Sequence, residues 1–431
     1  MTKATVLTCD ELMDPFYPPP SRLHYLVLAV TCRFMLRIRM VFRFLLHTVL
    51  LFSAAVASAA DNKPVYVGLD AELEYASSTS AQAIRMGMLI AMDEINQAGG
   101  VLGGRPLKLI ERDNKSLPAR SLANLKELAA QPDLVAVFCG RFSPTVLESI
   151  PLIHELQLPL LDPWGSADGI IDNGYNPNYV FRLSLRDSWA MPTMLRHAAQ
   201  KGAQRVGMLL LNTSWGRSNL KAAEAYVATH PEMKIVGIQW YNWADQTFLD
   251  KYAALKNAGA QAIVFVANHD EAGRLVREMV TMPKTERIPI VSHWGVTGGN
   301  FAEDAGPALQ EVDYAVVQTY SFIGASRPQA TQVLAAAQHS FGVKDARSLA
   351  APVGVAHAYD LTHILARAID MAGSTDRAAI RDALEQVRDY DGLIKHFPRP
   401  FTPERHEALI LEDVFMARYE PDQAIVRIPD R

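Results

Sequence analysis

Residues 134–166 read LVAVFCGRFSPTVLESIPLIHELQLPLLDPWGS and contain two short apolar runs separated by a helical pattern. The runs Leu134–Cys139 and Leu158–Leu161 are typical of strands that are covered on both faces. Ser143 and Pro144 suit the N-cap and first turn of the helix between them. Strand, helix and strand in this order predict a right-handed βαβ unit in a parallel sheet.

The same alternation continues on both sides of this stretch. A first set of strands is expected at 65–69, 107–112, 134–139 and 158–161, and a second at 206–211, 235–240, 262–267 and 288–292. Helices such as 83–96 and 119–130 lie between them. Because the two sets look alike, the chain is predicted to be an α/β protein with two similar doubly wound parallel-sheet lobes, and the boundary is expected near 184–187.

Composition agrees with a globular chain of two lobes. The protein has 431 residues, of which 49% are hydrophobic and 20% charged, and its net charge of -4 gives no reason to expect nucleic acid as a partner. Cys139 is expected to be a buried packing residue.

The first 60 residues are predicted to be a leader. Four arginines at 33, 37, 39 and 43 precede the apolar run 44–57, and Ala57-Ser58-Ala59-Ala60 follows it. This pattern is typical of a secretory signal peptide that is cleaved after Ala59 or Ala60, although an uncleaved anchor is an alternative. We expect the chain start to be over-extended, because Met35 or Met40 would make a more ordinary beginning.

Catalytic motifs are absent from the sequence. It contains no Gly-x-Ser-x-Gly and no His-Glu-x-x-His, and its 12 histidines are scattered without the spacing of metal ligands. The glycine-rich turn at 98–106 follows a helix and precedes a strand, which is the reverse of the order in a phosphate-binding loop. We therefore expect no catalytic residue, no cofactor and no metal.

Several segments resemble a known family, the type 1 periplasmic binding proteins of the branched-chain amino-acid and amide group. In order along the chain these segments are 87–104, 112–114, 140–143, 159–166, 356–360, 401–403 and 412–419. The resemblance implies two lobes joined by a hinge: residues 64–184 with about 320–390, and residues 185–319 with about 391–431. It also implies a monomeric periplasmic protein that captures a small ligand by hinge closure and passes it to the membrane permease of an ABC importer.

An alternative within the same fold is a periplasmic sensor that presents its ligand to a signalling partner. An exported enzyme is the less favoured alternative. The ligand implied is amino-acid-like, an amide or an aromatic carboxylate.

The resemblance places part of the ligand site in the first lobe. In such folds small ligands bind at the carboxyl ends of the strands, beside helix N-termini. The Ser143 hydroxyl, the backbone of Trp164 and the Ser166 hydroxyl would hold a carboxylate or an equivalent group. The alternative is that both serines only cap helices.

The second lobe would close over the other end of the ligand. Trp215 resembles the family's covering aromatic residue, and Asn268 falls near a position where the family often has Tyr. Trp294 stands where amino-acid binders commonly place an acidic residue for the ligand's ammonium group. This departure puts an ordinary α-amino acid in doubt and favours a ligand with an apolar or aromatic body.

The first loop, residues 70–75, also departs from the family pattern. Asp70, Glu72 or Glu74 could supply a counter-charge to a cationic ligand group, or these acids could be solvated loop residues. Asp70 and Tyr75 are counted among the expected ligand contacts. Asp187, just past the boundary between the lobes, is another expected contact.

Overall fold

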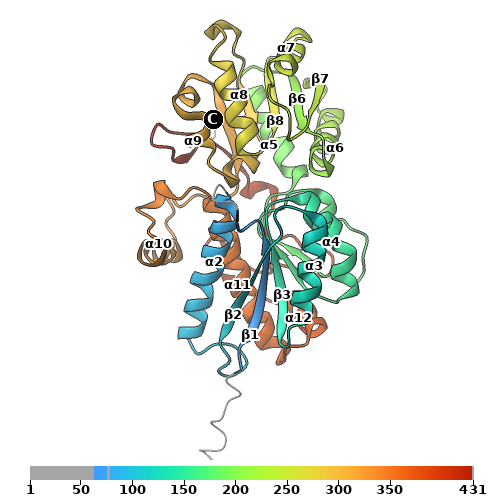
Figure 1. Ribbon diagram of the computed structural model, residues 1–431, viewed down its shortest axis with the longest axis vertical. Coiled ribbons are helices and arrows are strands. Elements are labelled where there is room, and N and C mark those ends of the chain that lie inside the picture. Colours follow the sequence, from blue (N-terminus) through green and yellow to red (C-terminus); the bar gives the residue numbers. More distant parts are fainter. Residues whose placement is uncertain (1–62, 75–77, 430–431) are drawn as a thin grey trace, which may run out of the picture. The chain divides into compact units, whose positions relative to one another are not determined.

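The computed structural model describes residues 63–74 and 78–429, so the predicted leader and Tyr75 lie outside the described residues. Its first sheet has five parallel strands in the order β2-β1-β3-β4-β5 (Figure 1). The bounds are β1 Val65–Ala71, β2 Leu107–Asp113, β3 Leu134–Cys139, β4 Leu160–Asp162 and β5 Val180–Arg182. β1 and β3 are almost wholly buried, as their apolar composition predicts.

The second sheet has seven strands in the order β14-β13-β10-β9-β8-β6-β7. Its strands are β6 Arg205–Leu211, β7 Lys234–Tyr241, β8 Ala262–Val266, β9 Ile290–Ser292, β10 Tyr314–Gln318, β13 Phe415–Tyr419 and β14 Ile425–Arg427. Counted from β6, the five parallel strands repeat the order of the first sheet. β13 and β14 run antiparallel and extend the edge beyond β10.

These two sheets confirm the predicted α/β class with two parallel-sheet lobes. The lobes are not equal, because the antiparallel pair β13–β14 enlarges the second one. Both sheets have the doubly wound order in which the chain reverses direction beside the first strand, and this reversal leaves a crevice at the carboxyl ends of the strands.

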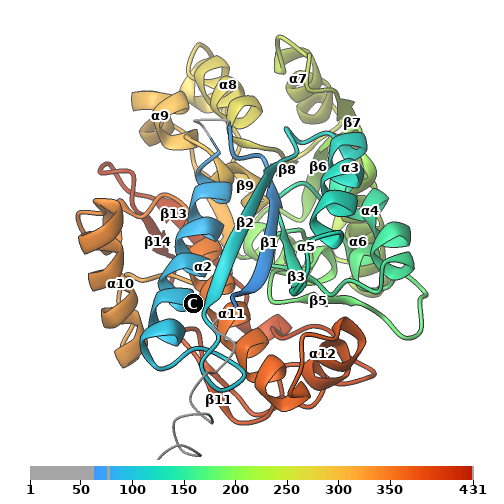
Figure 2. The same cartoon turned by 60° about the horizontal axis from the view of Figure 1, so that its bottom comes forward.

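Helices cover both faces of the first sheet. α2 (Thr79–Gln97) and α11 (Pro352–Ala372) pack together on one face, and α3 (Pro118–Ala129) and α4 (Ser143–Glu155) pack together on the other (Figure 1). α2 and α11 approach so closely that a Cβ at Gly87 would lie 2.2 Å from the carbonyl oxygen of Val355. α10 (Pro328–Phe341) lies beside α2 (Figure 2), and α12 (Arg377–Leu384) packs on α11.

The second sheet has its own helices. They are α5 (Asp187–Gln200), α6 (Ser214–Thr229), α7 (Leu249–Asn257), α8 (His269–Met279) and α9 (Phe301–Ala305). α5 packs on α6, β9, β10 and β13, and α8 packs on α9. Among the described residues, no helix combines the length and the apolar composition needed to cross a bilayer.

The chain returns to the first sheet after β10. The Tyr359 hydroxyl on α11 donates to Glu94 at 2.6 Å, and Arg377 Nε donates to the Leu134 carbonyl oxygen at 2.8 Å. A short hairpin, β11 (Tyr390–Asp391) with β12 (His396–Phe397), follows α12. The predicted ranges of the two lobes remain a prediction. In the structure, residues 390–407 still contact α11 and β5 of the first lobe. The chain then joins the second sheet at β13.

Candidate ligand-binding site

A small cavity lies where the carboxyl ends of strands from both sheets face one another. On the first-sheet side it is lined by Arg141, Phe142, Ser143, Pro144, Trp164 and Ser166, and on the second-sheet side by Leu211, Thr213, Trp215, Trp243, Asn268, Trp294 and Gly295. This position is where doubly wound folds bind ligands. Six of the nine predicted contacts line this one cavity, namely Ser143, Trp164, Ser166, Trp215, Asn268 and Trp294. Their contact with a ligand remains a prediction.

The two predicted serines do not cap helices. Phe142 is the N-cap of α4, and Ser143 is its first helical residue, so the expected N-cap at Ser143 is wrong. The Ser143 hydroxyl instead accepts hydrogen bonds from the N–H groups of Ser166 and Ala167, at 3.2 and 3.3 Å. Because the loop bends back onto the helix, this hydroxyl joins the two first-lobe loops that face the cavity.

Ser166 meets the second sheet directly. Its hydroxyl accepts a hydrogen bond from Trp215 Nε1 at 2.9 Å. The Trp164 N–H donates to Asp162 Oδ1 at 2.9 Å, so this predicted backbone donor is engaged within its own loop. The Trp215 contact therefore ties the two sides of the cavity together.

Tryptophan rings make up much of the cavity wall. The Trp164 and Trp294 rings lie 5.3 Å apart between centroids, and both residues are almost fully buried. Trp243 is 49% exposed at the edge of the cavity, where its ring meets Phe142 edge-on at 6.2 Å. Paired aromatic side chains give a large, rigid contact area for an apolar or aromatic group.

Arg141 is a cavity residue that the sequence analysis missed. Its guanidinium lies 4.6 Å from the Phe142 ring centroid and close to the carboxylate of Glu72. The sequence feature that could have indicated Arg141 is a charged residue directly after the predicted buried strand 134–139 and Gly140. That signal is weak, because arginine at a strand end is usually solvated.

Asp70, Glu72 and Glu74 are not among the residues that line this cavity. Asp70 accepts hydrogen bonds from Asn114, Ser121 and Asn124 at 3.0, 2.5 and 2.7 Å, and it lines a separate small cavity. Burial raises the pKa of Asp70, and these hydrogen bonds oppose that rise. Glu74 forms an exposed ion pair with Lys115 at 2.7 Å.

Asp187 is fully buried at the start of α5 and is not a lining residue of the cavity. Its Oδ1 lies 3.1 Å from His293 Nε2, and its N–H donates to the Ser166 carbonyl oxygen at 2.9 Å. The His293 ring in turn meets Trp215 edge-on at 4.9 Å. Asp187 thus lies behind the wall, next to the loop that carries Ser166.

Comparison with known proteins decides the family. A family model described as "Periplasmic binding protein" matches residues 64–424, which is most of the chain. The chain belongs to the periplasmic binding protein family. This confirms the resemblance that the sequence segments indicated.

Three similar proteins illustrate the range of the family. An amino acid binding protein from Pseudomonas aeruginosa is 23% identical over 243 residues, which are 56% of this chain and 63% of that protein. A type 1 periplasmic binding protein from Bordetella pertussis has a TM-score of 0.76 and 22% identity, and the match covers 85% of this chain and all of that one. A solute binding protein from R. palustris in complex with 4-hydroxybenzoate has a TM-score of 0.70 and 17% identity, covering 86% of this chain and 96% of that one.

In this periplasmic binding protein a buried ion network fixes the loop that carries Ser166. Arg182, fully buried on β5, makes two hydrogen bonds to the Glu407 carboxylate and donates to the carbonyl oxygens of Gly165 and Ala167 at 3.1 and 2.9 Å. Burial by itself would lower the pKa of Arg182, but the adjacent Glu407 raises it above its ordinary value.

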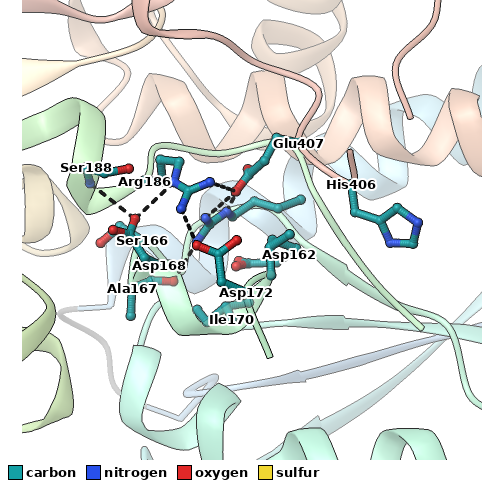
Figure 3. Close-up of polar contacts among 12 residues, drawn as sticks. Asp162, Ser166, Ala167, Asp168, Ile170, Asp172, Arg186, Ser188, His406 and Glu407 are labelled. Carbon is teal, nitrogen blue, oxygen red and sulfur yellow. Dashed lines mark hydrogen bonds and ion pairs between the residues drawn. The ribbon is translucent and has the colours of Figure 1, made fainter. Parts of the chain in front are cut away.

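Arg186 extends the same network toward the second lobe. It donates to Asp168 Oδ1 at 3.0 Å and lies 3.5 Å from Glu407, as Figure 3 shows. The Ser188 N–H donates to the same Asp168 oxygen at 3.1 Å. The loop is therefore anchored to two segments that connect the sheets, one after β5 and one before β13.

His357 on α11 lies behind Trp294 and is expected to make folding stability depend on pH. Its Nδ1 lies 2.8 Å from the Pro163 carbonyl oxygen, and burial lowers its pKa to about 4. The neutral ring is favoured in the folded protein, whereas the unfolded chain takes up a proton near pH 6.5. The contribution of His357 to the free energy of unfolding is therefore fully present above pH 6.5. It is lost as the pH falls through about 4, and the total loss is about 3 kcal/mol.

Replacing His357 with Asn should remove this loss. Urea unfolding at pH 7, 5.5 and 4 would show a shallower decline for the variant than for the natural protein. Asp162 and Asp360, whose pKa values burial raises to about 6, act in the opposite direction in both proteins and cancel in the comparison. The exposed His339→Asn serves as control, and equal slopes for His357→Asn and the natural protein would contradict the assignment.

Proposed function

We propose that this protein is the periplasmic substrate-binding component of an ABC importer, and that it captures a small carboxylate with an aromatic body. The lining of the cavity carries this proposal. Among the described residues that line it, Arg141 is the one charged side chain, none is Asp or Glu, and four are tryptophans, in addition to Phe142. An α-amino acid would bring an ammonium group into this space without a carboxylate to meet it.

A carboxylate fits the first-lobe side of the cavity. The N-terminus of α4 presents first-turn N–H groups there, and the helix dipole favours negative charge at this end. Arg141 adds a full positive charge next to it. The 4-hydroxybenzoate seen with the R. palustris relative is a ligand of this chemistry. It supports an aromatic carboxylate as the ligand rather than an amino acid, which is the ligand in the name of the P. aeruginosa relative.

The contacts between the two sides of the cavity support capture by hinge closure. Trp215 reaches across to Ser166, and Trp294 packs on Trp164. A ligand in the cavity beside these rings adds to the contacts of the closed arrangement and so shifts the equilibrium toward it. We propose that the membrane permease of the importer recognises the closed form, and that the protein acts as an exported monomer.

A thermal-shift screen tests the proposed function. The purified protein is heated with benzoate, 4-hydroxybenzoate, leucine, phenylalanine and benzamide, each at several concentrations. We expect a concentration-dependent rise in Tm with the aromatic carboxylates, because a ligand that binds only the folded state stabilises it. A rise with leucine and none with the aromatic acids would contradict the ligand class, and turnover of a probe would contradict the binding role.

A further inference from the structure

Arg141 and Glu72 form a buried charged pair beside the cavity. Glu72 follows β1 and is 1% exposed; its Oε1 accepts hydrogen bonds from the hydroxyls of Ser78 and Ser80 at 2.8 and 3.1 Å and lies 3.6 Å from Arg141 Nε. A Cβ at position 140 would lie 2.4 Å from Glu72 Oε2, so glycine there leaves room for the carboxylate. The side chain of Glu72 is thus fixed against Arg141.

The same arginine reaches the other lobe. Arg141 Nη1 donates a hydrogen bond to the carbonyl oxygen of Gly298, and the Ser80 hydroxyl oxygen lies 3.2 Å from that carbonyl oxygen. The Thr79 hydroxyl donates to the neighbouring Thr297 carbonyl oxygen at 3.3 Å. Closure of the lobes therefore brings the backbone at 297–298 onto Arg141 and the start of α2.

Closure leaves this guanidinium incompletely satisfied. The Arg141 side chain is 8% exposed, and its Nε has no hydrogen-bond partner among the described residues. Burial lowers the pKa of Arg141, and the charges of Glu72 and Glu271 oppose this shift. A buried cation that lacks part of its hydrogen bonding costs free energy, and another acceptor in the cavity would reduce that cost.

We propose that Arg141 couples recognition of the ligand's carboxylate to closure of the lobes. This inference rests on the proposed function. A carboxylate in the cavity gives the guanidinium a second anionic partner when water is excluded. The free energy of closure is therefore more favourable with a carboxylate than with a neutral ligand of the same shape. Glu72 holds the side chain where it meets both the cavity and Gly298.

Two variants on opposite lobes separate recognition from closure. Affinities for 4-hydroxybenzoate and its neutral amide, 4-hydroxybenzamide, are measured by titration calorimetry, and closure is followed by the radius of gyration in solution scattering. The natural protein should bind the acid about 100-fold more tightly than the amide. In Arg141→Gln this preference should fall below about 10-fold, and compaction on adding the acid should be lost.

Gly298→Ala acts from the second lobe. A Cβ at this position would lie 2.8 Å from Arg141 Nη1, so the variant crowds the contact between the lobes and keeps the charge of Arg141. It should weaken binding of both probes by about 10-fold and keep the preference for the acid. Arg112→Gln, which removes a partly exposed first-lobe arginine that pairs with Glu127, is the matched control and should behave as the natural protein.

The outcomes distinguish the two proposals. If the natural protein binds neither the acid nor any other aromatic carboxylate, the proposed function is wrong. If it binds the acid and Arg141→Gln keeps the full preference and compaction, the function stands and the coupling role of Arg141 is wrong. Unchanged affinities in Gly298→Ala would likewise overturn the coupling, because the contact with the second lobe would then contribute nothing.

Discussion

Replacing Glu407 with Gln should lower the free energy of unfolding by about 3–5 kcal/mol, because the change leaves the buried Arg182 without its anionic partner. Both side chains are almost completely buried, at 0 and 5% exposure. Arg182 also holds the carbonyl oxygens of Gly165 and Ala167, so it cannot turn to solvent without releasing the loop. Urea denaturation at pH 7 measures the change.

A second variant shows whether the destabilisation of Glu407→Gln comes from the buried, unpaired charge of Arg182 or from a loss of packing. The double variant Arg182→Met, Glu407→Gln removes both charges and should recover part of the stability lost in the single variant, because the hydrogen bonds of Arg182 to Gly165 and Ala167 are lost as well. Glu111→Gln removes a partner from a pair with Arg85 in which both side chains are about one-third exposed, and it should change stability little. If Glu407→Gln is no less stable than Glu111→Gln, the network does not carry the stability assigned to it.

Truncating Trp215 should have the largest effect on ligand affinity. Trp215→Ala removes a wall of the cavity and the hydrogen bond to Ser166, and we expect a loss of affinity for 4-hydroxybenzoate of about 100-fold or more. Trp215→Phe keeps an aromatic wall and loses only the Nε1–H donor, so its affinity should fall by about 3- to 10-fold. Titration calorimetry of both variants gives the two values.

Trp189→Ala is the matched control for this experiment. Trp189 belongs to α5 in the same lobe, packs against Arg186 with 5.7 Å from the guanidinium carbon to the ring centroid, and does not line the cavity. It should bind the probe like the natural protein, even if it unfolds at a lower temperature. Affinity in Trp215→Ala that equals that of Trp189→Ala would remove Trp215 from the site.

Much of the fold could be predicted because buried parallel strands leave a strong local pattern. The apolar run 134–139 matches β3 at both ends, and the helix expected at 119–130 is shifted by one residue from α3. The resemblance placed about 391–431 in the second lobe, but the strands β13 and β14 were not themselves predicted. The pairing of β13 with β10 joins residues about 100 positions apart, and no local pattern reports such a long-range contact.

The site was predictable in part for a related reason. Loops after strands must gather at one edge of a parallel sheet, so Ser143 and Trp164 could be placed near one another from strand order. Trp294 follows a strand of the second sheet, and only the family resemblance placed it near them. The partners of buried charges could not be placed in this way. Glu72, Arg141 and Gly298 come from three distant segments, and only the folded chain shows that one guanidinium meets both of the others.

Titration of the purified protein with 4-hydroxybenzoate and, separately, with leucine tests the central claim most directly. The cavity has aromatic walls, one buried arginine and no lining carboxylate among the described residues, so the account predicts saturable binding of the aromatic acid to one site per chain. Leucine should bind at least about 100-fold more weakly, because its ammonium group would lose water without gaining an acceptor. Tight, saturable binding of leucine with no heat from the aromatic acid would contradict the account.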